Sequence, residues 1–455
     1  MIQELNKETA IYVFMLCLCF AGVFSKPTEA TRKNPDDVAK LKKFVNEQIK
    51  KGAKLSKDIN EQINGVEYEW DEKGNIKFIR WEDCNFTGSI KVPSFSNLEY
   101  VMILGNNPGL KSIDAGINQS LISLVCRGSI PSDMDKQKSA INKLSVKGCK
   151  NLKYLEAGWN NFKSIDLSGN KNLELLGLPG CKLRKLNISK NRKLSYLNIS
   201  DSKNLLGIDT KDCPALETLY ISGVGFTEID ISKNTRLKEF YFDRAKFTSM
   251  DLRKNKKLEL LSCKNGALRG NGLLIGKNSN ISDVRCRGNK LSKLDVTKCE
   301  NLKKLDLTNN NIPNLDISKN NKLEELFCSK NPLGKLELSN LANLVMLWCN
   351  NCKLRELDLK GTGKLEYLHC DNNKIKRLDI SGLEHLGYLY CRNNLLKHLD
   401  ITENKRLREL HCENNKIKKL DIRNCEIKKY LSFGDEFFSH DTGVVIVKKR
   451  KTGKI

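Results

Sequence analysis

Hydrophobic and polar residues alternate along this chain in a unit that recurs about every 21 residues. Each unit contains two half-motifs, L-x-x-L-x-C and L-x-x-L-D-I, and in both of them apolar and polar positions alternate as in a half-buried strand. The last position of the first half-motif recurs at intervals of 21 residues in six consecutive units: Leu307, Cys328, Cys349, Cys370, Cys391 and Cys412. A fixed period of this length predicts a solenoid of stacked units.

The same position can be followed toward the N-terminus, where its spacing becomes less regular. It falls at Cys286, Cys263, Phe242, Ile221, Ile199, Leu178, Ala157, Cys126, Ile103 and Trp81. We count about sixteen repeats, more than the roughly three that a solenoid needs to bury its faces. The longest gap contains residues 129–135, which we expect to form an exposed loop. Because so short a unit leaves no room for a full helix, we expect a parallel sheet on one side and short strands or turns on the other.

The motif L-x-x-L-x-L-x-x-N/C-x-L resembles that of the leucine-rich repeat proteins from about Ile76 to Phe433. The nested 21-residue form is similar to that of secreted bacterial members such as internalins and adhesins, whereas the first unit, residues 76–90, is closer to the plant-type L-x-G-x-I variant. The resemblance implies a right-handed, curved solenoid of α/β type that is largely β, with its parallel sheet on the concave side. It also implies a recognition scaffold without catalysis, because this fold carries its function on exposed residues.

The ends of the chain predict three further segments. The apolar run Ile11–Phe24 indicates a signal peptide, residues 1–25, cut after Ser25, with an uncleaved anchor as the alternative. Residues 26–65 predict a helical N-terminal cap that begins at Asn34-Pro35 and runs to about Ile63. The solenoid then covers residues 66–433, and residues 434–455 form a short C-terminal cap and basic tail. The apolar residues assigned to a capping strand pair are Leu431, Phe433, Phe437, Phe438 and 444–447.

The 17 cysteines of the chain first indicate disulfides or a metal site. Those after the leader, however, all fall at inward apolar positions or at the Asn positions of the two half-motifs. Inward Cβ atoms on adjacent strands would lie about 4.8 Å apart, which is wider than the roughly 3.5–4.5 Å of a relaxed disulfide. We therefore predict mostly free thiols, despite an expected oxidising compartment. Cys349 and Cys352 are the one C-x-x-C pair, so we expect no zinc site, no other metal and no cofactor.

The charged residues follow the repeat as well. The net charge is +25, but Lys and Arg are spread through every repeat, whereas nucleic-acid binders concentrate them on one face. We therefore expect solvated edges and no nucleic-acid partner. An acidic column occupies the return leg: Asp166, Asp230, Asp251, Asp295, Asp316, Asp358, Asp379, Asp400 and Asp421, with Glu337 and Asn187 as variants. These carboxylates are predicted to fasten the following turn through backbone N–H groups; a calcium ladder is the alternative.

The residue before each inward cysteine must point to the opposite, concave face of the sheet. At these positions, and two residues earlier, the C-terminal repeats carry side chains that are mostly aromatic. The predicted partner-binding residues are Phe327, Met346, Trp348, Tyr367, His369, Tyr388, Tyr390 and His411; Tyr220 and Tyr241 occupy the same positions farther back. An exposed apolar patch of this kind marks an interaction site, although aromatic ladders also stabilise sheets.

The sequence thus predicts a monomeric, non-catalytic scaffold, secreted or at the cell surface, that binds a protein or glycan and has no transmembrane span once mature. A structural component of the cell envelope and an inhibitor-type binding protein are the alternatives. An enzyme with active groups near Asp133 or around His440 and Asp441 is a third. The chain lacks a recognisable Ser-His-Asp set, phosphate loop or paired-carboxylate pocket.

Overall fold

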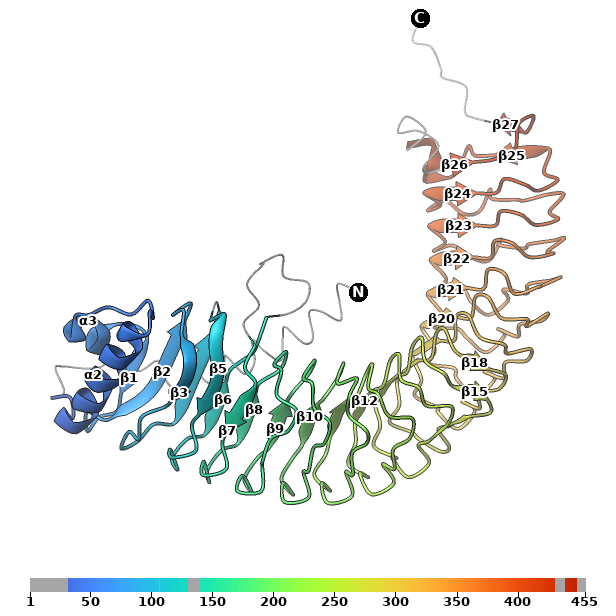
Figure 1. The fold of residues 1–455 in the computed structure, drawn as a ribbon. Helices are drawn as coiled ribbons and strands as arrows, with labels where there is room; N and C mark the ends of the chain where they lie inside the picture. Colours follow the sequence, from blue (N-terminus) through green and yellow to red (C-terminus); the bar gives the residue numbers. More distant parts are fainter. Residues whose placement is uncertain (1–31, 106, 130–139, 430–437, 448–455) are drawn as a thin grey trace, which may run out of the picture. The chain divides into compact units, whose positions relative to one another are not determined.

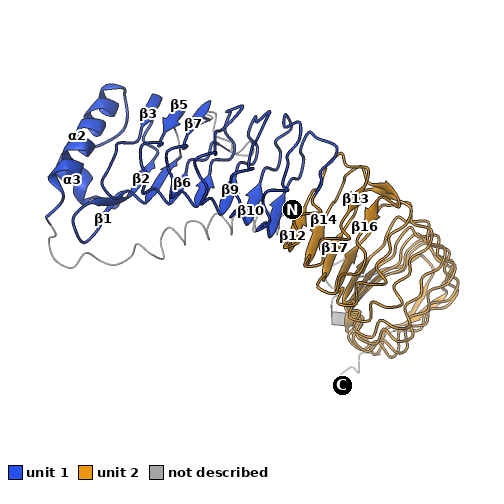
Figure 2. Ribbon diagram, turned by 90° about the horizontal axis from the view of Figure 1, so that it is seen from below, with its two compact units in different colours: residues 1–230 blue, residues 231–455 orange. Residues whose placement is uncertain are grey.

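The computed structural model of this 455-residue chain describes residues 32–105, 107–129, 140–429 and 438–447. It divides into two compact units, residues 1–230 and 231–455 (Figure 2). The predicted signal peptide, the loop around Asp133 and the cap residues Leu431, Phe433 and Phe437 lie outside the described residues.

Unit 1 begins with two helices, α2 (Pro35–Lys50) and α3 (Ile59–Asn64). The Asn34 side chain accepts a hydrogen bond from the Asp36 N–H at 2.9 Å, which confirms the predicted helix start. One helical segment was expected as far as Ile63, but α2 ends at Lys50 because Gly52 takes a φ of 93°. Phe44 of α2 stacks on Trp81 at 4.6 Å between ring centroids, so the helix covers the first strand of the stack.

The strands of unit 1 form one long sheet and one short sheet. In the long sheet, β1 (Tyr68–Trp70) pairs antiparallel with β2, and all later strands are parallel. These are β2 (Ile76–Glu82), β4 (Tyr100–Leu104), β6 (Ser123–Val125), β8 (Tyr154–Glu156), β9 (Leu175–Gly177), β10 (Tyr196–Asn198) and β11 (Thr218–Tyr220). The short sheet on the return legs contains β3 (Thr87–Lys91), β5 (Gly109–Asp114) and β7 (Lys143–Ser145).

Unit 2 repeats the arrangement with one strand per turn, stacked in sequence order (Figure 1). The parallel strands are β12 (Glu239–Tyr241), β14 (Leu260–Ser262), β17 (Asp283–Arg285), β19 (Lys304–Asp306), β20 (Glu325–Phe327), β21 (Met346–Trp348), β22 (Tyr367–His369), β23 (Tyr388–Tyr390), β24 (Glu409–His411) and β26 (Phe438–Ser439). The return legs hold the two-residue pairs β13 (Met250–Asp251) with β16 (Leu273–Leu274) and β15 (Arg269–Gly270) with β18 (Lys290–Leu291), and a 3-10 helix spans Glu426–Lys429. The prediction of a sheet on one side and short strands or turns on the other is confirmed.

The C-terminal cap differs from the predicted strand pair. β26 pairs with β24, whereas β27 (Val445–Val447) pairs with β25 (Lys419–Asp421), so the two terminal strands do not pair with each other. Each one extends a different face of the stack. The reason is that a parallel solenoid offers two open strand edges at its end, and the chain covers both of them with one further turn.

The interior of each turn is closed by side chains that also satisfy the backbone. The inward cysteines Cys349, Cys370 and Cys391 are fully buried, and the fifteen described cysteines are all buried, as predicted. Asn331 donates from Nδ2 to the backbone carbonyls of Leu307, one turn earlier, and of Cys328, both at 2.9 Å. Asparagine therefore recurs here because its amide supplies a buried donor between turns that an apolar side chain lacks.

On the return leg, the predicted role of the acidic column is also confirmed. Asp316 Oδ1 accepts from the Ser318 N–H at 3.1 Å and from its hydroxyl at 2.7 Å. Asp379 and Ser381 form the same pair of bonds. These carboxylates hold the turn that leads into the next strand.

Candidate functional site

The strands of unit 2 present three rows of side chains on the face opposite the cysteines. Consecutive parallel pairings align the third residue of each strand, and these residues form what we call the aromatic row: Phe327, Trp348, His369, Tyr390 and His411. The first residues of three of the strands form the tyrosine row: Met346, Tyr367 and Tyr388. The residue after each inward cysteine forms the polar row: Ser329, Asn350, Asp371, Arg392 and Glu413.

The predicted orientation of these side chains is observed. Cys349 and Cys391 are fully buried, whereas the preceding Trp348 is 43% exposed and Tyr390 is partly exposed. Among the Phe, Tyr and Trp residues whose burial is described, Trp348 is the one that is exposed. Phe327, Met346, Tyr367, His369 and Tyr388 are each partly buried. The sequence therefore placed this set on the correct face.

Some predicted residues are less accessible than expected. His411 is only 4% exposed, because β26 adds a strand beyond β24 and brings Ser439 against the imidazole. Tyr220 and Tyr241 are buried as well. Alternation identifies the face on which a side chain lies, but neighbouring rows decide how much of the side chain remains exposed.

The rings of the aromatic row contact one another along the whole row. Phe327 meets Trp348 edge to face at 5.2 Å, and Trp348 meets His369 at 5.8 Å with an interplanar angle of 70°. His369 lies 5.2 Å from Tyr390, and Tyr390 stacks on His411 at 5.0 Å and 9°. In the tyrosine row, Tyr367 and Tyr388 stack at 4.4 Å and 7°. Stacked rings cover each other's faces, whereas the ring of Trp348 is steeply inclined to the rings of both of its neighbours.

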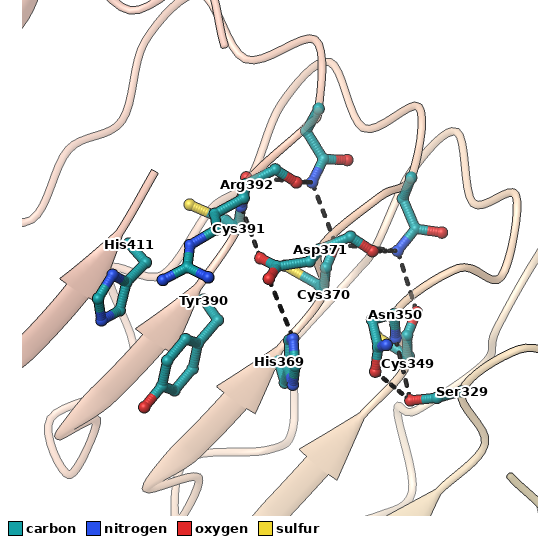
Figure 3. Close-up of polar contacts among 12 residues, drawn as sticks. Ser329, Cys349, Asn350, His369, Cys370, Asp371, Tyr390, Cys391, Arg392 and His411 are labelled. Carbon is teal, nitrogen blue, oxygen red and sulfur yellow. Dashed lines mark hydrogen bonds and ion pairs between the residues drawn. The ribbon is translucent and has the colours of Figure 1, made fainter. Parts of the chain in front are cut away.

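The polar row holds the aromatic row from one side (Figure 3). Asp371, which is buried, accepts from the backbone N–H of Arg392 at 2.6 Å and contacts His369 Nε2 at 3.0 Å. Arg392 pairs with Glu413 at 2.7 Å and lies 6.0 Å from the ring centroid of Tyr390. Ser329 donates to Asn350. Sequence reasoning missed this row, although polar residues at one-repeat spacing directly after the inward cysteines were the available signal.

His411 joins the aromatic row to the C-terminal strand. Its Nε2 lies 2.9 Å from Glu409 Oε1, and a carboxylate can only accept, so Nε2 carries a hydrogen. The Ser439 hydroxyl donates to Glu413 at 2.6 Å, and His411 Nδ1 lies 2.6 Å from the same hydroxyl oxygen. Tyr390 donates to Glu409 as well. These contacts connect the aromatic row to the C-terminal strand β26.

No protein-family model and no curated protein sequence matches this chain. Among solved structures, it is similar to the functional domain of InlJ from Listeria monocytogenes, which is described as including a cysteine ladder. The two are 28% identical over 70% of this chain and 73% of that one, with a TM-score of 0.60. The repeat motif, the single strand per turn and the ladder from Cys328 to Cys412 agree with this match. The chain is a leucine-rich repeat protein.

Two further matches are more distant. Toll in the Drosophila Toll–Spätzle complex is 18% identical over 75% of this chain and 58% of that one, with a TM-score of 0.50. A leucine-rich repeat protein of Leptospira interrogans is 20% identical over 74% and 94% of the two chains, with a TM-score of 0.47. At these identities the likeness concerns the leucine-rich repeat fold alone.

Partial burial keeps the phenols of Tyr367 and Tyr390 on the leucine-rich repeat face neutral. Burial, and then the hydrogen bond to Glu409, raise the pKa of Tyr390 well above its usual value. Burial, followed by the neighbouring Tyr388, raises the pKa of Tyr367. Both side chains therefore remain hydroxyl donors over the physiological pH range, and the face offers neutral polar groups beside its apolar rings.

The alternative chemistries find little support in the described parts of the chain. No group of three or more His, Cys, Asp or Glu side chains there could hold a metal ion. Asp441 accepts from the backbone N–H groups of Asn414 and Asn415 at 2.6 and 3.0 Å, so its carboxylate serves as a turn cap. A cavity of about 670 Å³ lies in unit 1 along residues 206–208 and 225–230, apart from the three rows. Within the described ranges, no helix is long and apolar enough to span a bilayer.

Proposed function

We propose that this leucine-rich repeat protein is an exported, non-catalytic recognition scaffold that binds a protein partner on the strand face of unit 2. The observation that carries the proposal is Trp348, an indole 43% exposed in the middle of a row whose other members are partly or fully buried. Tryptophan is among the residues that dominate binding energy when a partner covers them.

The surroundings of Trp348 suit an anchor of this kind. Phe327 and His369 contact the indole from either side, and the inward Leu347 and Cys349 fix its strand in the core. A side chain held in this way loses little conformational entropy on binding. Polar groups of the neighbouring row, such as Asn350 and Arg392, lie beside it and are partly exposed. An apolar centre beside a polar border is the usual composition of a protein interface.

Ring stacking favours a protein over a glycan as the partner. A sugar chain that runs along aromatic residues needs exposed ring faces, but Tyr367 and Tyr388 cover each other's faces, and so do Tyr390 and His411. These rings direct mainly edges and hydroxyl groups toward a ligand. Phe327, Trp348 and His369 are not stacked on a neighbour, but Trp348 alone of these three is exposed, and a single exposed ring suits one inserted side chain better than a series of sugars.

Export rests on the apolar N-terminal run Ile11–Phe24 and on the likeness to InlJ. The proposal that the chain is not an enzyme rests on the regular use of its carboxylates as turn caps, as at Asp316 and Asp441. A structural envelope component, which is the alternative, would not need an accessible side chain such as Trp348 on this face.

The test compares Trp348→Ala with Leu395→Ala, which removes a 37% exposed apolar side chain elsewhere in unit 2. Immobilised wild-type and variant proteins are exposed to extracellular proteins, and a glycan array is probed in parallel. We expect Trp348→Ala to weaken binding of a specific protein at least tenfold, about 1.4 kcal/mol or more, and Leu395→Ala to leave it unchanged, with equal melting temperatures. A protein partner retained by Trp348→Ala, or a glycan lost by it, would contradict the proposal.

A further inference from the structure

A second surface of unit 2, on the turns that lead into the strands, carries aligned positive charges. Five successive turns place an exposed lysine at the same repeat position, directly before a buried Asn or Cys; we call these residues the lysine column. They are Lys233, Lys254, Lys277, Lys298 and Lys319. In the linear sequence these cations look evenly spread, but stacking of the turns brings them into one line.

The backbone beneath the lysine column is held in place from turn to turn. Asn255 donates from its side chain to Ile231 O and Asn234 O of the preceding turn at 3.1 and 3.0 Å. Asn278 donates to Asn255 O at 3.2 Å, and Asn320 donates to Val296 O and Cys299 O at 3.0 and 2.9 Å. Because each turn is fastened to the one before it, the lysines recur at the spacing of the stack, close to the 4.8 Å between neighbouring strands.

The charge of these turns is mainly positive, although every lysine of the column except Lys277 lies three residues after a carboxylate of the acidic column; these carboxylates are Asp230, Asp251, Asp295 and Asp316. The segments 232–236, 253–257, 276–280, 297–301 and 318–322 contain one acidic residue, Glu300. Besides the lysine column, they carry the cations Arg236, Arg253, Lys256, Lys257 and Lys322. Arg253 pairs with Asp251 at 2.7 Å, and Lys322 donates to the neutral Asn301 at 2.6 Å. The column is also bounded, because the next turn, residues 339–343, has no charged residue.

We propose that the lysine column binds an acidic polysaccharide that lies along the stack. Like charges held at this spacing repel one another, and an extended chain with regularly spaced anions would neutralise them and release their counterions. The side chains between the lysines, such as Ser279, Asn280 and Asn321, are exposed and can hydrogen-bond sugar hydroxyl or sulfate groups. This inference concerns a different surface from the aromatic row and does not depend on the proposed protein partner.

A nucleic acid fits the lysine column less well. Proteins that bind single strands stack the bases on aromatic side chains, and the five segments contain no Phe, Tyr, Trp or His. The nearest aromatic side chains of unit 2 lie on its strands, as in β12 and β20. The turns therefore offer charge and hydrogen-bond donors without a base platform.

The experiment uses heparin as the probe and two triple variants that remove equal charge. Lys254→Ala, Lys277→Ala and Lys298→Ala together interrupt the lysine column. The matched control is Lys374→Ala, Lys376→Ala and Lys397→Ala, which removes exposed lysines from segments that follow the strands of the same unit. Binding is measured at several salt concentrations, with circular dichroism and melting curves for all proteins. Lys277→Ala alone provides a milder variant if the triple variant melts early.

We expect the column variant to bind heparin about tenfold or more weakly than the wild-type protein. The dependence of its affinity on salt concentration should also be shallower, because roughly two to three fewer counterions are released on binding. The control should stay within about twofold, since its lysines lie outside the column. Equal losses in both variants would show unspecific attraction and overturn the proposal. So would an absence of heparin binding by the wild-type protein, or displacement of heparin by single-stranded DNA of equal charge at a lower concentration.

Discussion

At the scale of single residues, the buried asparagines explain why the repeat keeps one polar position inside an apolar stack. The Asn373 side chain makes five hydrogen bonds, one of them a longer one from its amide to Asp371 O at 3.2 Å. Its amide donates to Cys349 O and Cys370 O at 3.0 and 2.9 Å, and its oxygen accepts from the N–H groups of Cys352 and Leu354, both at 3.0 Å. One side chain thus satisfies backbone groups of two neighbouring turns, and no apolar residue of similar size could do so.

Replacement of Asn373 by leucine should therefore destabilise unit 2 strongly. The change leaves buried backbone donors and acceptors without partners, and we expect a loss of about 2–4 kcal/mol in the free energy of unfolding. Urea denaturation followed by circular dichroism measures the loss. Asn314→Leu, at an exposed position, is the control and should change stability by less than about 0.5 kcal/mol. Similar values for both variants would show that these hydrogen bonds contribute little.

The cysteine ladder leads to a prediction about reactivity. Cys349 and Cys391 are fully buried, and burial, followed by the neighbouring Cys370, raises the pKa of both thiols well above the usual value. Thiolates are the reactive species, so these residues should behave as inert apolar side chains. We expect the native protein to react with a thiol reagent such as DTNB far more slowly than the protein in guanidinium chloride. Rapid labelling of Cys349 or Cys391 in the native protein, located by mass spectrometry, would contradict this.

The face of the sheet on which a side chain lies could be predicted from the sequence more securely than the exposed fraction of that side chain. Alternation placed Trp348 and Tyr390 outside and Cys349 and Cys391 inside, as observed. It placed His411 outside too, where β26 covers it. Coverage depends on the next element along the stack, and the spacing within one repeat contains no information about that element.

At the scale of elements, the acidic column should make the turns sensitive to low pH. The hydrogen bond from the Ser168 hydroxyl, and then its backbone N–H and Lys147, lower the pKa of Asp166 to about 2. Hydrogen bonds from Ser318 and Ser381 lower the pKa values of Asp316 and Asp379 in the same way. In an unfolded chain Asp titrates near 3.9. Each carboxylate therefore stabilises the folded state above that pH, and this contribution is lost as the pH falls toward the folded pKa.

We expect the melting temperature to fall between about pH 5 and pH 2, and Asp316→Asn combined with Asp379→Asn to make this fall shallower. An amide oxygen can still accept from the turn, as Asn187 does from the Ser189 N–H at 3.0 Å. The double variant should thus melt close to wild type at pH 6. Asp316→Ala with Asp379→Ala removes the acceptor and should melt lower at pH 6. If the Asn variant shows the full acid dependence, titration of these two carboxylates does not cause it.

Elements could be predicted well where they repeat and less well where the chain begins and ends. The strands of unit 2 follow the motif from β12 to β24, and the return legs follow it as turns. The break between α2 and α3 depends on Gly52 and on a second cap at Asp58, whose side chain accepts from the Asn60 N–H at 2.8 Å. The pairing of β26 and β27 with two separate sheets requires knowledge of both open edges, which the apolar residues alone do not give.

At the scale of the whole molecule, the repeat period determines which residues lie together on one surface. The +25 net charge suggested a solvated exterior because Lys and Arg are spread along the sequence. When the repeats stack, evenly spread residues form columns, because any residue at a fixed repeat position lines up with its equivalents in the other repeats. The lysine column arises in this way on the turns that precede β12 to β20, and the aromatic row arises in this way on strands β20 to β24. Repeat proteins should therefore be assessed by position within the repeat and not by position along the chain.

The same one-dimensional organisation predicts how the N-terminal cap acts. In a solenoid each turn is stabilised mainly by its neighbours, so the first turn depends on the helix that covers it. Phe44 of α2 stacks on Trp81 and lies 6.1 Å from Phe86, and Leu41 beside it is fully buried. Phe44→Ala should cost about 3–5 kcal/mol at this end of the chain. Lys42→Ala, an exposed change on the same helix, is the matched control.

Hydrogen exchange distinguishes a local effect from a global one. In Phe44→Ala we expect the amides of β2 and β4 to lose protection first, those of β10 to lose less, and those of β20 to β23 in unit 2 to stay as in wild type. The gradient follows because the lost contacts lie at one end, and each further turn retains its own buried leucines and asparagine bonds. A uniform loss of protection across both units would mean that the chain unfolds as a single cooperative body, and nearest-neighbour stability would then not describe it.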